Sequence, residues 1–270
     1  EILGQAAEAK GKTYNATIGS ANEEDGSTMR LSSLESLINM HPNEIFTYTS
    51  AYGKPELRDI WEKMIFQKNP SLKNTISKPV VTIALSHGLN TIGFLFFEKG
   101  DKIFITDKYW GNYNFMFENS YGAKIKTFNT FKNAKLDLDA FETTLKQNPG
   151  KQCVVLNFPN NPAGYTPTEK EAHGIVDILK NSAKRGNKIL AIIDDAYFGL
   201  VYKDKIYKES LFSLLSDAHE NILAVKADGA TKEDYVWGFR VGFLTYSTKN
   251  ITQASCEALE DKTAGVIRAT

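Results

Sequence analysis

The stretch Asp228-Gly-Ala-Thr-Lys232-Glu-Asp-Tyr-Val-Trp-Gly238-Phe-Arg240-Val-Gly242 places one lysine among turn-forming residues and an arginine eight positions later. The apolar runs 221–226 before it and 239–246 after it have the pattern of short buried strands. Lys232 is therefore expected in a loop at a strand end, where ligands gather in open α/β sheets. A lysine amine that loses its proton in a sheltered site can condense with an aldehyde as a Schiff base. Most lysines are solvated surface residues, so the rest of the chain must support this reading.

Length and composition narrow the class of protein. The chain has 270 residues, a formal net charge of +0 and 42% hydrophobic residues, with a pI of about 7.1 and a mean hydropathy of −0.32. Neither a nucleic-acid surface nor an anionic membrane surface is indicated, and no apolar run approaches the roughly 18–20 residues that span a bilayer. Cys153 and Cys256 have neither metal-ligand spacing nor a disulfide pattern, which predicts no metal site and a cytoplasmic location. The chain starts without Met and stops inside an apparent element, so we expect a fragment.

Regularly spaced apolar segments predict the fold. Seven runs rich in β-branched residues, separated by helical patterns or turns, occur at 80–85, 102–106, 124–128, 152–157, 188–194, 221–226 and 239–246. Such alternation predicts an α/β fold with three layers, α/β/α, around a mostly parallel seven-stranded sheet. We expect residues 1–45 to form an N-terminal arm or part of a small domain, and residues 46–270 to form one large domain.

Polar residues end several of these predicted strands. Asp194 closes an apolar strand and would be costly to bury unless a cation meets it; Asp195 competes for the same role. The cluster 158–164, with two asparagines and two prolines, predicts a rigid turn that no core requires. Gly88 in Ser86-His-Gly-Leu-Asn90 can let backbone N–H groups point at an anion such as phosphate, at the start of a helix.

Taken in order along the chain, these stretches resemble the fold type I pyridoxal-phosphate enzymes, most closely the class I and II aminotransferases. The resemblance covers roughly residues 15–270 and includes Asp107-Lys-Tyr-Trp110-Gly-Asn-Tyr113, Asn161-Pro-Ala-Gly164 and Asp194-Asp-Ala-Tyr197. It implies the cofactor pyridoxal 5'-phosphate, the transferase fold of that family, and a C-terminal small domain that is expected to be missing from these residues.

The resemblance also implies roles for individual residues. Lys232 would form the Schiff base, and its freed amine would move the proton from the substrate α-carbon. The Asp-x-x-Tyr spacing selects Asp194 over Asp195 as the partner of the pyridine nitrogen. The remaining cofactor-binding roles are phosphate binding by Arg240, Gly88, Leu89 and Asn90, stacking by Trp110, and hydrogen bonding to the ring oxygen by Asn161 and Tyr197.

Further implied residues concern the substrate and a second subunit. Tyr48 would reach the cofactor phosphate of the neighbouring subunit in a homodimer. Ile18 and Gly19 would lie over the substrate carboxylate, and Arg268 loosely resembles an arginine that reaches a dicarboxylate side chain across the dimer. The expected substrates are an amino acid and a 2-keto acid.

Departures from the family pattern leave alternatives open. Where the family often has Ser three residues before the lysine, this chain has Gly229, and neither Asp228 nor Thr231 can be assumed to replace it. The same residues serve β-lyases, racemases and cyclopropane-carboxylate synthases, and an aminotransferase-like regulatory module without activity is another reading. A nicotinamide-binding domain is disfavoured because the first strand is not followed by Gly-x-Gly-x-x-Gly.

Overall fold

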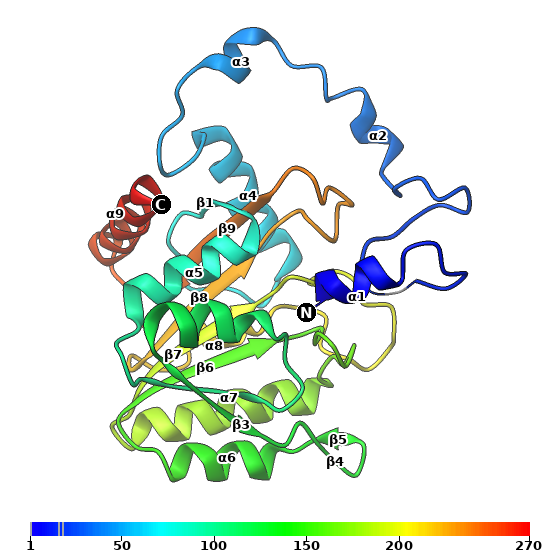
Figure 1. The fold of residues 1–270 in the computed structure, drawn as a ribbon. Helices are drawn as coiled ribbons and strands as arrows, with labels where there is room; N and C mark the ends of the chain where they lie inside the picture. The colour runs from blue at the N-terminus through cyan, green and yellow to red at the C-terminus, as the bar shows by residue number, and fades with distance from the viewer. Residues whose placement is uncertain (1, 16, 18) are drawn as a thin grey trace.

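Seven strands form a single twisted sheet in the computed structural model, which describes residues 2–15, 17 and 19–270 (Figure 1). Their order across the sheet is β1-β9-β8-β7-β6-β2-β3. The pairs β3/β2, β2/β6, β6/β7 and β7/β8 are parallel, whereas β9 runs antiparallel to both β8 and β1. The strands are β1 (Val80–Ile83), β2 (Lys102–Thr106), β3 (Lys124–Phe128), β6 (Lys151–Asn157), β7 (Lys188–Asp194), β8 (Ile222–Asp228) and β9 (Val241–Ser247). The predicted α/β fold with a mostly parallel sheet is confirmed.

Helices cover both faces of this sheet. On one face lie α5 (Ala84–Phe96), the π-helical turn η1 (Asn114–Asn119) and α9 (Gln253–Ala269). On the other face lie α4 (Pro55–Lys68), α6 (Leu138–Lys146), α7 (Glu169–Lys184) and α8 (Leu211–Leu215). A small hairpin, β4 (Phe131–Lys132) and β5 (Lys135–Leu136), lies outside the sheet. The result is the three-layer arrangement that the sequence predicts.

Strand β7 shows how the sheet divides the core in two. Ile189, Ala191 and Ile193 belong to the cluster on the α7 side, and Leu190 and Ile192 to the cluster on the α5 side. Successive side chains of a strand point to opposite faces, so a strand covered on both sides must be apolar throughout. Burying one Ile or Leu side chain completely stabilises the folded state by about 1.5–3 kcal/mol relative to leaving it exposed. This alternation also sends the two aspartates after Ile193 to opposite faces.

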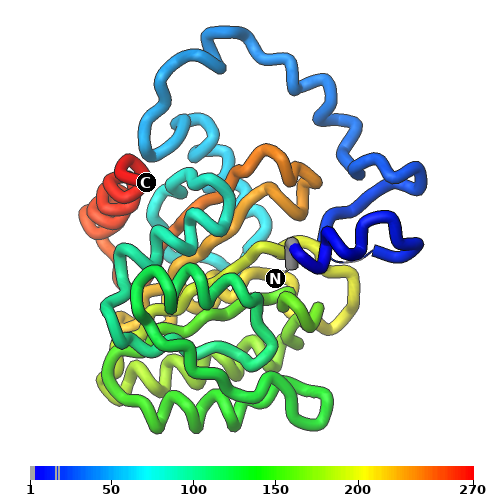
Figure 2. The backbone as a smooth tube through the Cα atoms, viewed as in Figure 1, coloured from blue at the N-terminus to red at the C-terminus, as the bar shows by residue number. Residues whose placement is uncertain are grey.

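The N-terminal segment runs largely outside these layers. It carries the short helices α1 (Ile2–Glu8), α2 (Ser32–Glu35) and α3 (Pro42–Phe46), and Figure 2 shows it arching away before it joins α4. Large side chains on it are open to solvent, with Phe46 83% and Tyr48 103% exposed. None of the helices in the described part of the chain has the length and apolar character needed to cross a membrane.

Candidate functional site

A cavity of ≈ 600 Å³ opens at the carboxyl ends of β6, β7 and β8, next to the first turn of α5. The loops that follow parallel strands meet at this edge of the sheet, which is where open α/β sheets bind ligands. Residues that the sequence singled out converge here from distant parts of the chain: Gly19, Trp110, Asn161, Asp194, Tyr197, Lys232 and Arg240.

Asp194 is the buried carboxylate of this cavity. Only 2% of the residue is exposed, and its side chain accepts hydrogen bonds from the Tyr113 hydroxyl at 2.5 Å and the Ala196 N–H at 3.0 Å. Burial raises the pKa of Asp194 above its ordinary value, while these two hydrogen bonds oppose the rise. Asn157 donates to the main-chain carbonyl of Asp194 and fixes the strand end. A buried carboxylate of this kind is suited to a cationic ligand group.

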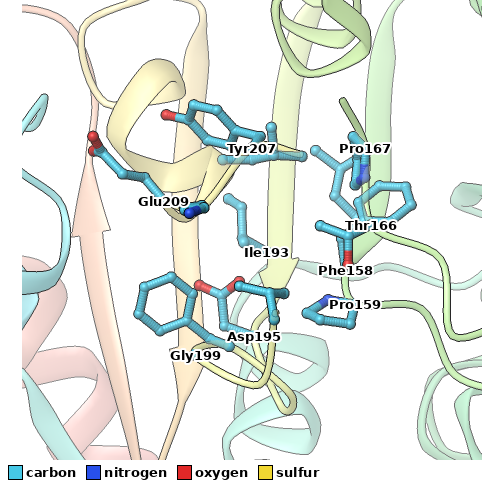
Figure 3. Close-up of a pocket in the computed structure, with 14 residues that line it drawn as sticks. Phe158, Pro159, Thr166, Pro167, Ile193, Asp195, Gly199, Tyr207 and Glu209 are labelled. Atoms are coloured by element: carbon cyan, nitrogen blue, oxygen red, sulfur yellow. The ribbon is translucent and has the colours of Figure 1, made fainter. Parts of the chain in front are cut away.

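Asp195 faces the other side of the sheet. Figure 3 shows it beside Ile193 in a separate cavity of ≈ 20 Å³, which has room for about one water molecule. There the Asp195 carboxylate pairs with Lys226 and accepts a hydrogen bond from Ser210 at 2.6 Å. Asp195 is therefore part of a buried ion pair and does not line the larger cavity.

Lys232 lies in the turn that follows β8, and its Nζ atom is 5.5 Å from the centre of the Tyr197 ring. Burial lowers the pKa of Lys232 below its ordinary value, and the nearby positive charge of Arg240 lowers it further. A lysine with a lowered pKa has a larger fraction of neutral, nucleophilic amine at neutral pH. Burial and the charge of Arg240 thus both favour the neutral amine that Lys232 needs to form a Schiff base.

The first turn of α5 provides an anion-binding corner. Ala84 has a left-handed backbone (φ 57°) and donates its N–H to the Arg240 carbonyl at 2.9 Å, which joins the helix start to the arginine. Leu85 and Ser86 line the cavity. The side chain of the N-cap residue Ile83 accepts no hydrogen bond from the first turn of the helix. N–H groups in a first turn have no intrahelical acceptor and carry partial positive charge. Because the Ala84 N–H is bonded to the Arg240 carbonyl, Leu85 and Ser86 are the first-turn residues whose N–H groups can serve a ligand in the cavity that they line with Arg240.

The prediction that Gly88, Leu89 and Asn90 form this corner is wrong. Helix α5 starts at Ala84, so these three residues lie inside it and do not line the cavity. Gly88 and Leu89 are buried against the sheet, where a Cβ at Gly88 would stand 3.2 Å from Leu244 Cδ2. The side chain of Asn90 lies within hydrogen-bond distance of the Tyr121 hydroxyl. Close packing against Leu244 therefore explains why position 88 is a glycine.

The remaining predicted residues lie elsewhere or outside the description. Tyr48 is fully exposed and Arg268 is exposed near the end of α9, and neither lines the cavity. Ile18 lies outside the described residues. The sequence predicts no role for several lining residues, namely Ser86, Tyr113, Asn157 and Trp237, and it leaves the role of Thr231 open. Of these, only Tyr113 could have been predicted to lie near the cavity, because it follows Trp110 by three residues, about one helical turn.

Comparison with known proteins identifies the family. The family model described as aminotransferase class I and II matches residues 25–266. The chain belongs to this family. Members of the class I and II aminotransferase family depend on pyridoxal 5'-phosphate. The resemblance inferred from the sequence is confirmed.

Individual relatives of this aminotransferase-family chain are distant. It is 26% identical over 210 residues to a probable N-acetyl-LL-diaminopimelate aminotransferase of Bacillus subtilis, covering 77% of this chain and 49% of the relative. It is 27% identical over 213 residues to an aspartate aminotransferase of Sulfurisphaera tokodaii, covering 77% and 50%. The chain thus spans about half the length of these curated relatives. An aminotransferase structure from Anaerococcus prevotii shares the fold, with a TM-score of 0.86, 22% identity, and coverage of 100% of this chain and 67% of that one.

Proposed function

We propose that this chain is the cofactor-binding part of an aminotransferase that moves an amino group between an amino acid and a 2-keto acid. The observation that carries the proposal is the convergence of Lys232, Asp194 and Arg240 on one cavity. A nucleophilic amine, a buried anion and a cation are the groups needed to bind a phosphorylated pyridine aldehyde. We further propose that residues 46–270 form the cofactor-binding domain and residues 1–45 an arm.

The lining residues fit pyridoxal 5'-phosphate. Asp194 would meet the protonated ring nitrogen, and Trp110 would cover a ring face. Arg240 has no ion-pair partner among the residues that the structure describes, and with the N–H groups of Leu85 and Ser86 it would bind the phosphate. The two residues that would hydrogen-bond the ring oxygen are Asn161 and Tyr197.

When bound, pyridoxal phosphate supplies an aldehyde for the amine and a ring that accepts electrons. The amine of Lys232 would accept the proton from the substrate α-carbon. It would then donate this proton to the carbon of the cofactor's aldehyde group. Its lowered pKa increases the fraction of neutral amine that can act as a base. Asp194 would remain ionised and keep the ring nitrogen protonated, while the fixed position of Lys232 makes the proton transfer effectively intramolecular.

Assembly and location are also proposals. The exposed Tyr48 is available to a second copy of the chain, which supports a homodimer in which Tyr48 reaches the neighbour's phosphate. Arg268 would act on a substrate side chain across the same dimer. Both cysteines are free and buried, which supports a cytoplasmic location.

The test is the visible absorption spectrum of the full-length protein, before and after adding glutamate, aspartate and alanine in turn. Transamination requires a lysine-bound cofactor band that disappears with an amino donor and returns with a keto acid. A band that never converts to the amine form of the cofactor would favour a lyase, a racemase or a regulatory module. If reconstitution with pyridoxal phosphate gives no band, the proposal built on Lys232 is wrong.

A further inference from the structure

Position 229 is closed to any side chain. A Cβ atom on Gly229 would stand 2.5 Å from the Val241 carbonyl oxygen and 2.9 Å from the Gly242 Cα. Both are backbone atoms, so they cannot move aside as the end of a flexible side chain would. The serine hydroxyl that the family often places three residues before the lysine is therefore excluded here by the close approach of β8 and β9.

The neighbouring polar residue Asp228 is committed elsewhere. Its Oδ1 accepts a hydrogen bond from Trp61 Nε1 at 3.1 Å, and its Oδ2 lies 3.2 Å from the Lys226 Nζ. Both partners lie on the face of the sheet away from the large cavity, beside Asp195. A carboxylate would in any case repel a phosphate. Asp228 cannot supply the missing donor.

Thr231 does line the cavity, and its hydroxyl has no partner. The residue is 6% exposed, and Oγ1 is buried without a hydrogen bond in the described structure. A buried hydroxyl without a partner is unfavourable, and each one in a native protein needs an explanation. Two other threonines, Thr91 and Thr245, share this property but do not line the cavity. Its place in the cavity distinguishes Thr231 from these two threonines.

The backbone around Thr231 brings it to the anion-binding corner. A Cβ on Gly229 would stand 3.2 Å from Leu85 Cδ1, and one on Gly242 would stand 2.6 Å from the Ala84 carbonyl carbon. The end of β8, the first turn of α5 and the segment after Arg240 therefore meet at one point. Thr231 follows that point by two residues and precedes Lys232.

We propose that the Thr231 hydroxyl donates a hydrogen bond to the cofactor phosphate and replaces the donor that position 229 cannot carry. This rests on the proposed function, because it requires a phosphorylated ligand in the cavity. Thr231 would act with Arg240 and the α5 first turn, and the hydroxyl would then be satisfied only in the cofactor-bound protein. The Trp237 indole N–H, which also lines the cavity without a partner, remains available to other parts of a ligand.

The test compares pyridoxal phosphate with pyridoxal, which lacks the phosphate. The full-length protein is stripped of cofactor, and the dissociation constants of both compounds are measured by quenching of tryptophan fluorescence for the parent, Thr231→Val and Thr231→Ser. Loss of a hydrogen bond to a charged group predicts that Thr231→Val binds pyridoxal phosphate roughly tenfold or more weakly. Its affinity for pyridoxal should stay within about twofold of the parent, and Thr231→Ser should restore most of the phosphate-dependent affinity.

Thr91→Val and Thr245→Val are the matched controls, since each removes an equally buried, unpartnered hydroxyl outside the cavity. Both should leave the ratio of the two dissociation constants unchanged. An unchanged ratio in Thr231→Val, or an equal loss of both ligands, would overturn the inference while leaving the proposed function intact. A parent protein that binds neither compound would overturn both. Thermal unfolding of the stripped variants, which should match the parent, separates a binding effect from a folding defect.

Discussion

The hydroxyl of Tyr113 donates a 2.5 Å hydrogen bond to Oδ2 of Asp194, and both residues are buried. The Tyr113 ring stacks on Phe117 with 5.6 Å between ring centres, which fixes the direction of the hydroxyl. A hydrogen bond to the charged form of a carboxylate favours ionisation, whereas burial disfavours it. We therefore expect Tyr113 to act as a positioning residue that favours the ionised form of Asp194 and holds its carboxylate in place.

Replacing Tyr113 with Phe should move the pH profile of the enzyme. The hydrogen bond lowers the pKa of Asp194, so its removal raises that pKa. The acid limb of kcat/KM against pH should shift to higher pH, and kcat should fall about tenfold, as expected for a lost bond to a charged group. Tyr121→Phe is the control, because that hydroxyl bonds Asn90 outside the cavity. An unshifted acid limb would show that Tyr113 does not act through Asp194.

Replacing Lys232 with Ala should abolish the visible absorption band of the lysine-bound cofactor and turnover with every amino donor. No other lysine lines the cavity, within the part of the chain that the structure describes, so nothing can take over the covalent role. Spectra and turnover of the reconstituted variant are measured against Lys249→Ala, which removes an exposed lysine before α9. Full activity in the Lys232 variant would refute the scheme.

Replacing Arg240 with Gln should have two separable effects. Cofactor retention should weaken roughly tenfold or more, since a charged phosphate contact is lost. The pKa of Lys232 should rise, because the Arg240 charge now helps to lower it. Cofactor dissociation and the pH dependence of Schiff-base formation measure the two effects. Arg185→Gln, at the end of α7 and remote from the cavity, should show neither.

The strands and the polar residues at their ends could be predicted from the sequence, because apolar periodicity and polar strand ends are local signals. The turn after β1 was not, because its left-handed residue is Ala84 and not a glycine. A search for glycine therefore selected Gly88, which is small because it packs against Leu244. Left-handed backbone at a non-glycine residue is uncommon and has no sequence signature.

Tertiary contacts account for the other gaps. The bond from Tyr113 to Asp194 joins residues that are 81 positions apart, and the closure of position 229 depends on the backbone of Val241. The spacing of the aspartate and tyrosine selected Asp194 in place of Asp195. Only the strand alternation, with one carboxylate in the cavity and the other on Lys226, gives the physical reason for that choice.

Lys226 is fully buried and pairs with both Asp195 and Asp228. These ion pairs connect the ends of β7 and β8 on the face of the sheet away from the large cavity. Burial opposes its charge, yet the two carboxylates hold the pKa of Lys226 above its ordinary value of 10.5. The stability that this group contributes is thus present below pH 10.5 and is lost as the pH rises through the raised value in the folded state. Lys226→Met would leave two buried carboxylates without a counter-charge.

The expected loss in the free energy of unfolding for Lys226→Met is about 3–5 kcal/mol at neutral pH, measured by urea denaturation of the cofactor-free protein. Lys146→Met, which breaks an exposed pair with Glu142 on α6, should cost less than about 1 kcal/mol. Adding Asp195→Asn to Lys226→Met should recover part of the loss, because one unpaired carboxylate is removed. If Lys226→Met is as stable as the parent, the carboxylates take up protons or water without penalty, and this buried ion pair does not fix the strand ends that carry Asp194 and Lys232.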